Sequence, residues 1–396
     1  MRSNIPFYRT LARNTTFWII SLSHLLTHVF DLMNVALIPV FTDEFSITLV
    51  HAGWLVTVPL LASMASSLLS GIVMSKFSLK PLMIVSLSLM GVAALLVSVT
   101  SNFLMLALYL SLLTFASRLY CPPALSIVSE SCEDCERNRG KTVGFHVSIV
   151  MLGIAFGPIG LGFITLHANW RLSYLIWAIP LFVSAVPVAR MNVDLLTERE
   201  ESEATEGEGK SLKITSIVTA GFILLLIALG FRSMGVQGIS TFMTTYFVAE
   251  KGLSQSTASM LFGAGRACGI IGVFVGGALS DTLGKKRWIT ITWTASLLSL
   301  LAFSQAPSMP LLILFFVLYQ IFNSGSIAPV MSLVASFTSK SRRGLGYMMY
   351  FFSSSLIGAF SPIVTAQIIT GFGVGYIFPF VLIVLGAAIL LVQRSG

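Results

Sequence analysis

Apolar runs of about twenty residues recur along the sequence, separated by short polar or charged segments. Such a run can cross a hydrocarbon layer about 30 Å thick. It must be helical, because backbone N–H and C=O groups find no water inside a bilayer. Only 10% of the residues are charged, against about 25% in soluble domains. The sequence therefore predicts an all-α polytopic membrane protein with twelve transmembrane helices. These are expected near residues 17–41, 50–73, 80–99, 103–128, 143–166, 172–189, 214–248, 254–279, 288–306, 309–336, 345–369 and 374–392.

The positive charges are distributed unevenly between the two sides of the predicted membrane. If the N-terminus is cytoplasmic, 19 of the 24 Lys and Arg residues fall in cytoplasmic segments, and the opposite segments hold only Arg171 and Lys251. This is the positive-inside pattern, and it predicts that both termini are cytoplasmic. The net charge of +8 thus reflects topology, and we expect no nucleic-acid partner. We expect the cell membrane (inner or plasma) as the location.

A polar segment at 191–213 divides the chain into two halves. It is rich in glutamate and poor in apolar residues, which is typical of a flexible linker. We therefore expect one six-helix bundle at 1–190, a cytoplasmic linker at 191–213 and a second six-helix bundle at 214–396.

The two halves also resemble each other in sequence. Arg139-Gly140 and Pro158 recur 204 residues later as Arg343-Gly344 and Pro362, in the same order. A repeat at about half the chain length predicts that the two bundles are pseudo-symmetric. Transporters commonly use such duplications, because two related bundles can move about a site between them.

The predicted loop before the helix near 288–306 contains a motif of glycines, an acid and bases. Gly277 is followed by Asp281, Gly284 and Lys285, and then by two more basic residues. This motif resembles the loop signature of the major facilitator superfamily, and the resemblance covers nearly the whole chain. It implies a transporter that works by alternating access, in which Asp281 helps to latch the cytoplasmic gate. The glycines allow a tight turn there.

Other motifs extend this resemblance. Gly153, Gly157 and Pro158, in the helix near 143–166, resemble the superfamily's signature of that helix, which implies antiport. Glycines four residues apart permit close helix contact and proline bends a helix, so a plain packing seam is the alternative interpretation. The stretch Leu119–Pro123, together with the histidines of the first helix, resembles the fosmidomycin-resistance-like branch, which exports drugs and organic anions.

Four charged residues lie deep inside predicted helices: Asp31, Arg118, Arg232 and Arg266. A charge at the centre of a bilayer costs about 2.5–3.5 kcal/mol on insertion scales. Four would together cost about 10–14 kcal/mol, which rivals the stability of a whole protein. These side chains must therefore face one another or a hydrated cavity, and three arginines exceed what one carboxylate can pair.

The first helix places its titratable groups on one face. At about 100° per residue, His24, His28 and Asp31 form a stripe with Asn34 at its edge. Such groups along a cavity wall can hold or pass a proton. We expect Asp31 to be the main proton-coupling site, with His28, His24 and Arg118 tuning it. A hydrogen-bonded core role is the alternative for His24.

The excess of intramembrane arginine predicts an anionic substrate. Arg232 and Arg266 are the expected substrate ligands, because a guanidinium group matches a carboxylate, phosphate or phosphonate. Arg118, Asn34 and Tyr120 are further candidates for lining the substrate site.

The leading functional prediction is a proton-coupled secondary active transporter of a small organic anion, acting as an antiporter or exporter. A symporter or exchanger of a metabolite anion is an alternative, and a transport-inactive membrane receptor or sensor is an alternative of another class. The expected partners are the lipid bilayer, protons and a small-molecule substrate, and the expected state is a monomer.

The sequence argues against an enzyme. It contains neither an HExxH motif nor a phosphate-binding GxxxxGK[ST] loop. The predicted helices also lack a pair of buried acids that could act together. Cys132 and Cys135 form a single CxxC, which without a second pair is weak evidence for zinc. We expect no cofactor and no metal.

Overall fold

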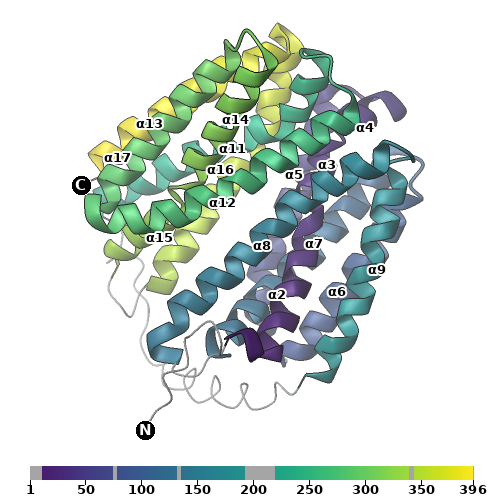
Figure 1. Cartoon of the computed structure of the whole chain (residues 1–396), viewed down its shortest axis with the longest axis vertical. Helices are drawn as coiled ribbons and strands as arrows, with labels where there is room; N and C mark the ends of the chain where they lie inside the picture. The colour runs from purple at the N-terminus through teal and green to yellow at the C-terminus, as the bar shows by residue number, and fades with distance from the viewer. Residues whose placement is uncertain (1–10, 75–77, 132–134, 192–218, 339–342, 396) are drawn as a thin grey trace. The chain divides into compact units, whose positions relative to one another are not determined.

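The structure, a computed structural model, describes residues 11–74, 78–131, 135–191, 219–338 and 343–395 (Figure 1). The described residues are helical apart from short connections, and no β-strand occurs among them. Asn14, Asn102, Thr219 and Ser254 each cap a helix, because their side chains accept a hydrogen bond from the backbone N–H three residues further on. Such caps satisfy donors that the first helical turn leaves without a partner.

The helices follow the predicted order along the chain. The N-terminal half contains α2 (Thr15–His28), the 3-10 turn η1 (Val29–Leu32), α3 (Met33–Ala36), α4 (Ile38–Glu44), α5 (Leu49–Met74), α6 (Leu79–Ser98), α7 (Phe103–Glu130), α8 (Cys135–Thr165) and α9 (Arg171–Arg190). The C-terminal half contains α11 (Ala220–Ala249), α12 (Gln255–Leu283), α13 (Lys285–Ser304), α14 (Met309–Ser324), α15 (Ile327–Ser336), α16 (Arg343–Phe372), the 3-10 turn η4 (Val374–Tyr376) and α17 (Ile377–Arg394).

Eleven segments of the described chain are long and apolar enough to cross a membrane. The twelfth predicted span, α13, is a helix of 20 residues, but three basic residues at its start and six Ser and Thr make it less apolar. Large apolar side chains face outward: Leu104 is 75% exposed and Ile383 72%. A bilayer would cover such surfaces. The predicted fold, an all-α membrane protein of twelve helices in two bundles, is confirmed.

Two of the predicted helices are interrupted rather than continuous. The first leaves α-helical geometry at η1 and again at Leu37, just before Pro39 in the first turn of α4. Proline lacks a backbone N–H and is accommodated in the first turn of a helix, so α4 begins anew after Leu37. The tenth predicted helix breaks at Gly325 and Ser326, which separate α14 from α15.

Contacts divide the chain into two compact units. Unit 1 comprises Met1–Asn34 and Ala62–Leu212, and unit 2 comprises Val35–Leu61 and Lys213–Gly396. One boundary lies at the end of the predicted linker. The predicted first bundle at 1–190 includes Val35–Leu61, but the contacts of this segment group it with unit 2. Within that unit, the Gln255 side chain donates to the carbonyl of Ala36 at 2.6 Å.

Buried polar contacts join the helices of unit 1. The hydroxyl groups of Ser66 in α5 and Ser86 in α6 donate to the carbonyls of Phe115 and Ala116 in α7, at 2.6 and 2.5 Å. The α2 helix packs against α7, α8 and α9, and α6 packs against α7 and α9 (Figure 1). Interhelical hydrogen bonds of this kind are one of the forces that associate helices in a bilayer.

Apolar side chains gather in two clusters in the described part of unit 2. One is formed by α11, α13, α15 and α17 and contains Phe222, Ile289 and Trp293. The other is an aromatic cluster in which Phe303 packs within 6.1 Å, between ring centroids, of four other rings. These belong to Tyr246, Phe247, Phe316 and Phe378.

Some sequence predictions lie outside the described part of the chain. The side chains of Cys132 and Cys135 are among these, and so is the predicted linker apart from Met191. The start of the predicted helix at 214–248 is also outside it, and the described helix begins at Ala220.

Candidate functional site

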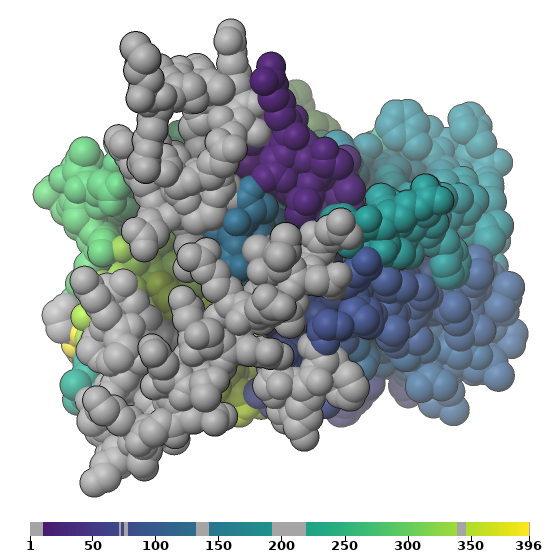
Figure 2. Space-filling model, turned by 90° about the horizontal axis from the view of Figure 1, so that it is seen from below, coloured from purple at the N-terminus to yellow at the C-terminus, as the bar shows by residue number. Residues whose placement is uncertain are grey.

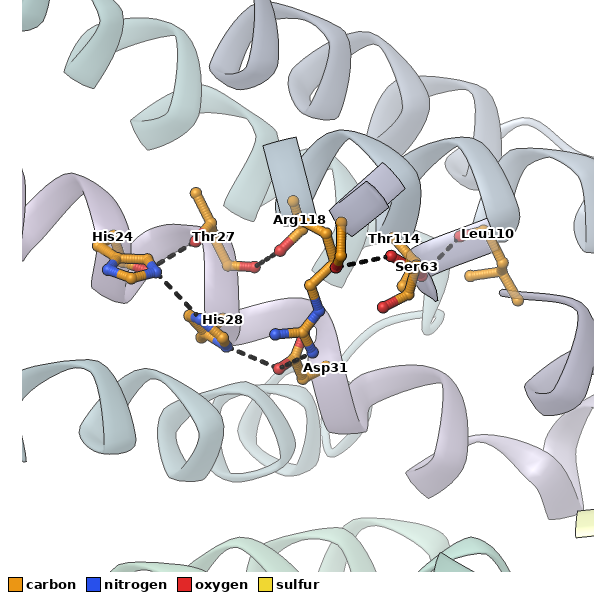
Figure 3. Close-up of polar contacts among 10 residues, drawn as sticks. His24, Thr27, His28, Asp31, Ser63, Leu110, Thr114 and Arg118 are labelled. Atoms are coloured by element: carbon orange, nitrogen blue, oxygen red, sulfur yellow. Dashed lines mark hydrogen bonds and ion pairs between the residues drawn. The ribbon is translucent and has the colours of Figure 1, made fainter. Parts of the chain in front are cut away.

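The break in the first helix carries the intramembrane acid of unit 1. Asp31 lies within η1, and its Oδ2 accepts a hydrogen bond from His28 Nδ1 at 2.7 Å (Figure 3). Arg118 of α7 donates from Nη2 to the same oxygen at 3.4 Å. The side chains of His28, Asp31 and Arg118 are 8%, 18% and 30% exposed. The acid is thus paired, but the pair is not sealed from its surroundings.

Two more histidines extend this cluster along α2. His24 Nε2 lies 3.3 Å from His28 Nε2, and His24 Nδ1 lies 2.8 Å from His146 Nε2 of α8. His146 Nδ1 in turn lies 2.8 Å from Ser21 Oγ. The four sequence-predicted side chains of this cluster therefore lie together, and His146 joins them.

His146 was not among the residues singled out from the sequence. It lies 122 residues from its partner His24, in a segment without a charged neighbour that would mark it. One sequence signal was available: His146 lies seven residues before Gly153. Two helical turns bring it to the same helix face as the glycines that contact the first helix.

Tyr120 and Asn34, predicted as substrate-lining residues, have different surroundings. Tyr120 is fully buried, its hydroxyl lies 2.5 Å from Ser23 Oγ, and its ring centroid is 5.5 Å from that of His24. Tyr120 thus packs beside the histidines. Asn34 lies in α3, three residues beyond Asp31, and is partly exposed.

Glycines bring α8 unusually close to α2. A Cβ added to Gly153 would lie 2.2 Å from the carbonyl oxygen of Leu25, and one added to Gly157 would lie 1.9 Å from that of Val29. Only glycine fits such a backbone approach. Pro158 follows within the same helix. This seam holds His146 against His24 and abuts the first residue of η1.

Arg232 supports the second helix break, in unit 2. Its Nη2 donates to the carbonyl and the side-chain oxygen of Asn323 at 2.7 and 2.8 Å, and to Ser326 Oγ at 3.0 Å. Its guanidinium carbon lies 5.3 Å from the ring centroid of Trp293. The carbonyls at the end of a helix lack intrahelical partners, so Arg232 stabilises the end of α14.

Arg266 has fewer protein partners. Its Nη2 donates to Ser240 Oγ, and its guanidinium carbon lies 5.6 Å from the ring centroid of Phe262. Its Nε is buried and has no hydrogen-bond partner among the described residues, and the same holds for the Tyr319 hydroxyl. Tyr319 interacts electrostatically with both Arg266 and Arg232. Within the described chain, no acidic oxygen lies within 4 Å of either arginine. Among the described residues of unit 2, these two intramembrane arginines therefore have no acidic partner, and Arg266 Nε and the Tyr319 hydroxyl have no hydrogen-bond partner.

The predicted gating motif spans the turn from α12 to α13. Gly277 and Asp281 lie in the last two turns of α12, and Asp281 is exposed. Gly284 has φ +86° and caps α12, with its N–H donating to the Ser280 carbonyl at 3.1 Å. This positive φ is the physical reason for glycine. Lys285 begins α13.

A pocket of about 340 Å³ lies elsewhere in unit 1. It is formed where the first turns of α2 meet the end of α9, the purple and teal surfaces that adjoin in Figure 2. Thr15, Ile19, Val186 and Arg190 are among its lining residues, and none of the intramembrane charged residues lines it. Among the described residues, no group of three or more His, Cys, Asp or Glu has the arrangement of a metal site.

Comparison with known proteins gives consistent results. A family model described as Major Facilitator Superfamily matches residues 20–303 and 225–394. A protein of Haemophilus influenzae, provisionally named a metabolite transport protein, is 21% identical over 252 residues. The match covers 60% of this chain, and the chain spans only 60% of that relative's length.

The fold is also similar to solved structures. A bacterial homologue of the human lysosomal transporter Spinster, in an inward-facing and occupied conformation, has a TM-score of 0.79 at 15% identity and covers 99% of this chain and 97% of its own. The xylose transporter XylE from E. coli, in a partially occluded inward-open conformation, has a TM-score of 0.73 at 13% identity, with 96% and 98% covered.

Proposed function

Since the chain belongs to the Major Facilitator Superfamily, we propose that it carries a small organic anion across the cell membrane by alternating access, coupled to protons. Asp31 is the proton-coupling carboxylate in this proposal, and Arg266 is the main substrate ligand, supported by Arg232. The observation that carries the proposal is the separation of charge inside the described membrane spans: Asp31 of unit 1 lies with histidines and Arg118, and Arg232 and Arg266 of unit 2 have no acidic partner.

The proton assignment rests on the contacts of Asp31. The carboxylate shares one oxygen between His28 and Arg118. Protonation of Asp31 would remove the negative charge that holds the Arg118 guanidinium, so a single proton changes the charge balance of the cluster. A site that binds protons can bias a conformational equilibrium only if it binds them differently in the two states. In this proposal Asp31 meets the condition through η1: the 3-10 turn would change its geometry between the two states and alter the contacts of Asp31 with His28 and Arg118.

The substrate assignment rests on the free donors near Arg266. An anion that accepts from Arg266 Nε and from the Tyr319 hydroxyl would satisfy two buried donors at once. It would also balance charge that the described protein leaves without an acidic partner. Carboxylates, phosphates and phosphonates all present oxygens suited to a guanidinium group.

The proposed direction of transport rests on resemblance. The Gly153, Gly157 and Pro158 motif resembles the antiporter signature, so we propose antiport and export. The protein would function as a monomer with both termini in the cytoplasm.

The test uses purified protein reconstituted in vesicles that contain the pH-sensitive dye pyranine. A panel of carboxylates, phosphate esters and phosphonates is added one by one, with and without an imposed pH gradient. Proton movement opposite to the anion supports antiport, and movement in the same direction supports symport. Exchange of anions without a dye signal would exclude proton coupling. Saturable binding without any flux would favour the receptor alternative.

A further inference from the structure

We infer that His146, His24 and His28 form a proton relay that connects Asp31 to Ser21. This inference rests on the proposed role of Asp31 and adds to it the path by which the proton arrives. The path crosses from η1 along α2 to α8, and it contains a residue that no sequence motif marks.

The relay is a continuous series of four hydrogen bonds. Its donor–acceptor distances are 2.8 Å from Ser21 to His146, 2.8 Å from His146 to His24, 3.3 Å from His24 to His28 and 2.7 Å from His28 to Asp31. Both nitrogens of all three rings take part. An imidazole with a partner at each nitrogen can accept a proton on one side and release one on the other.

The bonding pattern fixes the tautomers when Asp31 is ionised and all three rings are neutral. His28 must donate from Nδ1 to the carboxylate, so its Nε2 must accept from His24 Nε2. His24 Nδ1 then accepts from His146 Nε2, and His146 Nδ1 accepts from the Ser21 hydroxyl. Every bond thus points from Ser21 towards Asp31, and each ring carries one N–H.

One added proton reverses three of the four bonds. When His146 Nδ1 gains a proton at the Ser21 end, His146 passes its Nε2 proton to His24 Nδ1, and His24 passes its Nε2 proton to His28 Nε2. His28 becomes an imidazolium ion beside the Asp31 carboxylate, and the other two rings are again neutral. His146 then donates to Ser21 Oγ. Three N–H bonds form, two break, and one proton enters the relay.

The surroundings contain few competing groups. From α7, Arg118 and Cys121 face His28, and Tyr120 packs beside His24. Arg118 also lies within electrostatic reach of His24. From α9, Tyr174 faces Phe30 of η1 at 5.8 Å between ring centroids, and not the histidines. Within the described chain, Asp31 is the one acid that contacts the relay.

The relay also has a direction along the membrane normal. Ser21 precedes His28 by seven residues, which is about 10 Å of helix. The relay therefore leads from the break at η1 towards the N-terminal end of α2. The charge distribution predicts that this end is cytoplasmic. Ser21 and His146 are both fully buried, so protons enter only when water reaches this end.

The first experiment measures the tautomers directly and needs no substrate. The chain has five histidines, and replacing the exposed His51 and His167 by glutamine leaves only the relay residues. Protein with ¹⁵N-labelled histidine is titrated with acid in detergent and followed by NMR. We expect His146 and His24 to change their protonated nitrogen over the same pH interval in which His28 becomes doubly protonated, and His24→Phe to uncouple His146 from His28. A His146 tautomer that stays constant while His28 gains a proton would overturn the relay.

The second experiment separates this inference from the proposed function. Vesicles carry wild type, Asp31→Asn, His146→Gln or the control His167→Gln, and the probe is the panel anion with the largest wild-type pyranine signal. We expect the ratio of proton-driven flux to anion exchange to fall at least tenfold for both Asp31→Asn and His146→Gln. If only Asp31→Asn lowers the ratio, the relay is refuted and the proposed function stands. If neither variant does, both are refuted. Should His146→Gln fail to fold, the NMR titration decides.

Discussion

Replacing Gly157 by alanine perturbs the seam that holds the proton-coupling cluster. The new Cβ would lie 1.9 Å from the oxygen and 2.9 Å from the carbon of the Val29 carbonyl. Ordinary C···O contacts measure about 3.3–3.6 Å, so α8 and the Val29 carbonyl at the start of η1 must separate by roughly 1.4 Å. Neither obstructing atom is the end of a flexible side chain, and the strain cannot be relieved by a change of rotamer.

The expected cost follows from two opposing effects. An additional methyl group in a packed contact destabilises by about 1–3 kcal/mol, and alanine recovers up to about 1 kcal/mol of helix propensity relative to glycine. Because the clash is with backbone atoms, the overpacking cost should lie near its upper limit. The net decrease in the free energy of unfolding is then about 1–2 kcal/mol. For a domain of about 150–250 residues, this lowers Tm by about 2–8 °C.

Thermal unfolding in detergent, followed by tryptophan fluorescence, measures this loss. Gly144→Ala is the matched control, since it lies in the same helix and its Cβ would meet nothing within 4 Å. We expect the control to melt at or above the wild-type temperature. If Gly157→Ala melts together with Gly144→Ala, the reasoning about a close backbone seam is wrong.

Two further perturbations concern unit 2. Arg266→Gln should weaken binding of the transported anion by about 10–150-fold, since a hydrogen bond to a charged group contributes about 1.5–3 kcal/mol. A ligand-induced thermal shift measures this, and unchanged affinity, or an equal loss in the exposed control Arg287→Gln, would contradict the assignment. Gly284→Ala should destabilise by about 1–2 kcal/mol, because φ is +86° there. Gly277→Ala, which meets no atom within 4 Å, should not, and equal Tm values for the two would count against a strained turn.

The helices were predictable because the bilayer imposes one dominant pattern. Apolar runs long enough to span the bilayer are visible directly in the sequence, and the asymmetric distribution of Lys and Arg supports an even number of transmembrane helices. The interruptions were harder to predict. Pro39 was a signal for the break near Leu37, but η1 lies in a stretch with no proline or glycine. Its position depends on packing partners, such as Gly157 against Val29, that are distant in sequence.

The sequence marked parts of the candidate site by two signals, which were charge inside predicted spans and the stripe of titratable residues on the first helix. Asp31, Arg118, Arg232 and Arg266 stand out because charge inside a bilayer is costly. His146 carries no obligatory charge, so the same test could not detect it. The hydrogen bonds of Arg232 with the end of α14 could not be predicted from the sequence either, since they depend on where the tenth helix breaks.

The proton-coupling role of Asp31 is tested most directly by comparing two transport modes in the same vesicles for wild type and Asp31→Asn. One mode is accumulation of the anion driven by a pH gradient, and the other is exchange of labelled for unlabelled anion without a gradient. Asp43→Asn, which removes an exposed acid, is the control. We expect Asp31→Asn to abolish gradient-driven accumulation while exchange continues, and the control to retain both. Gradient-driven accumulation at the wild-type rate in Asp31→Asn would contradict this role.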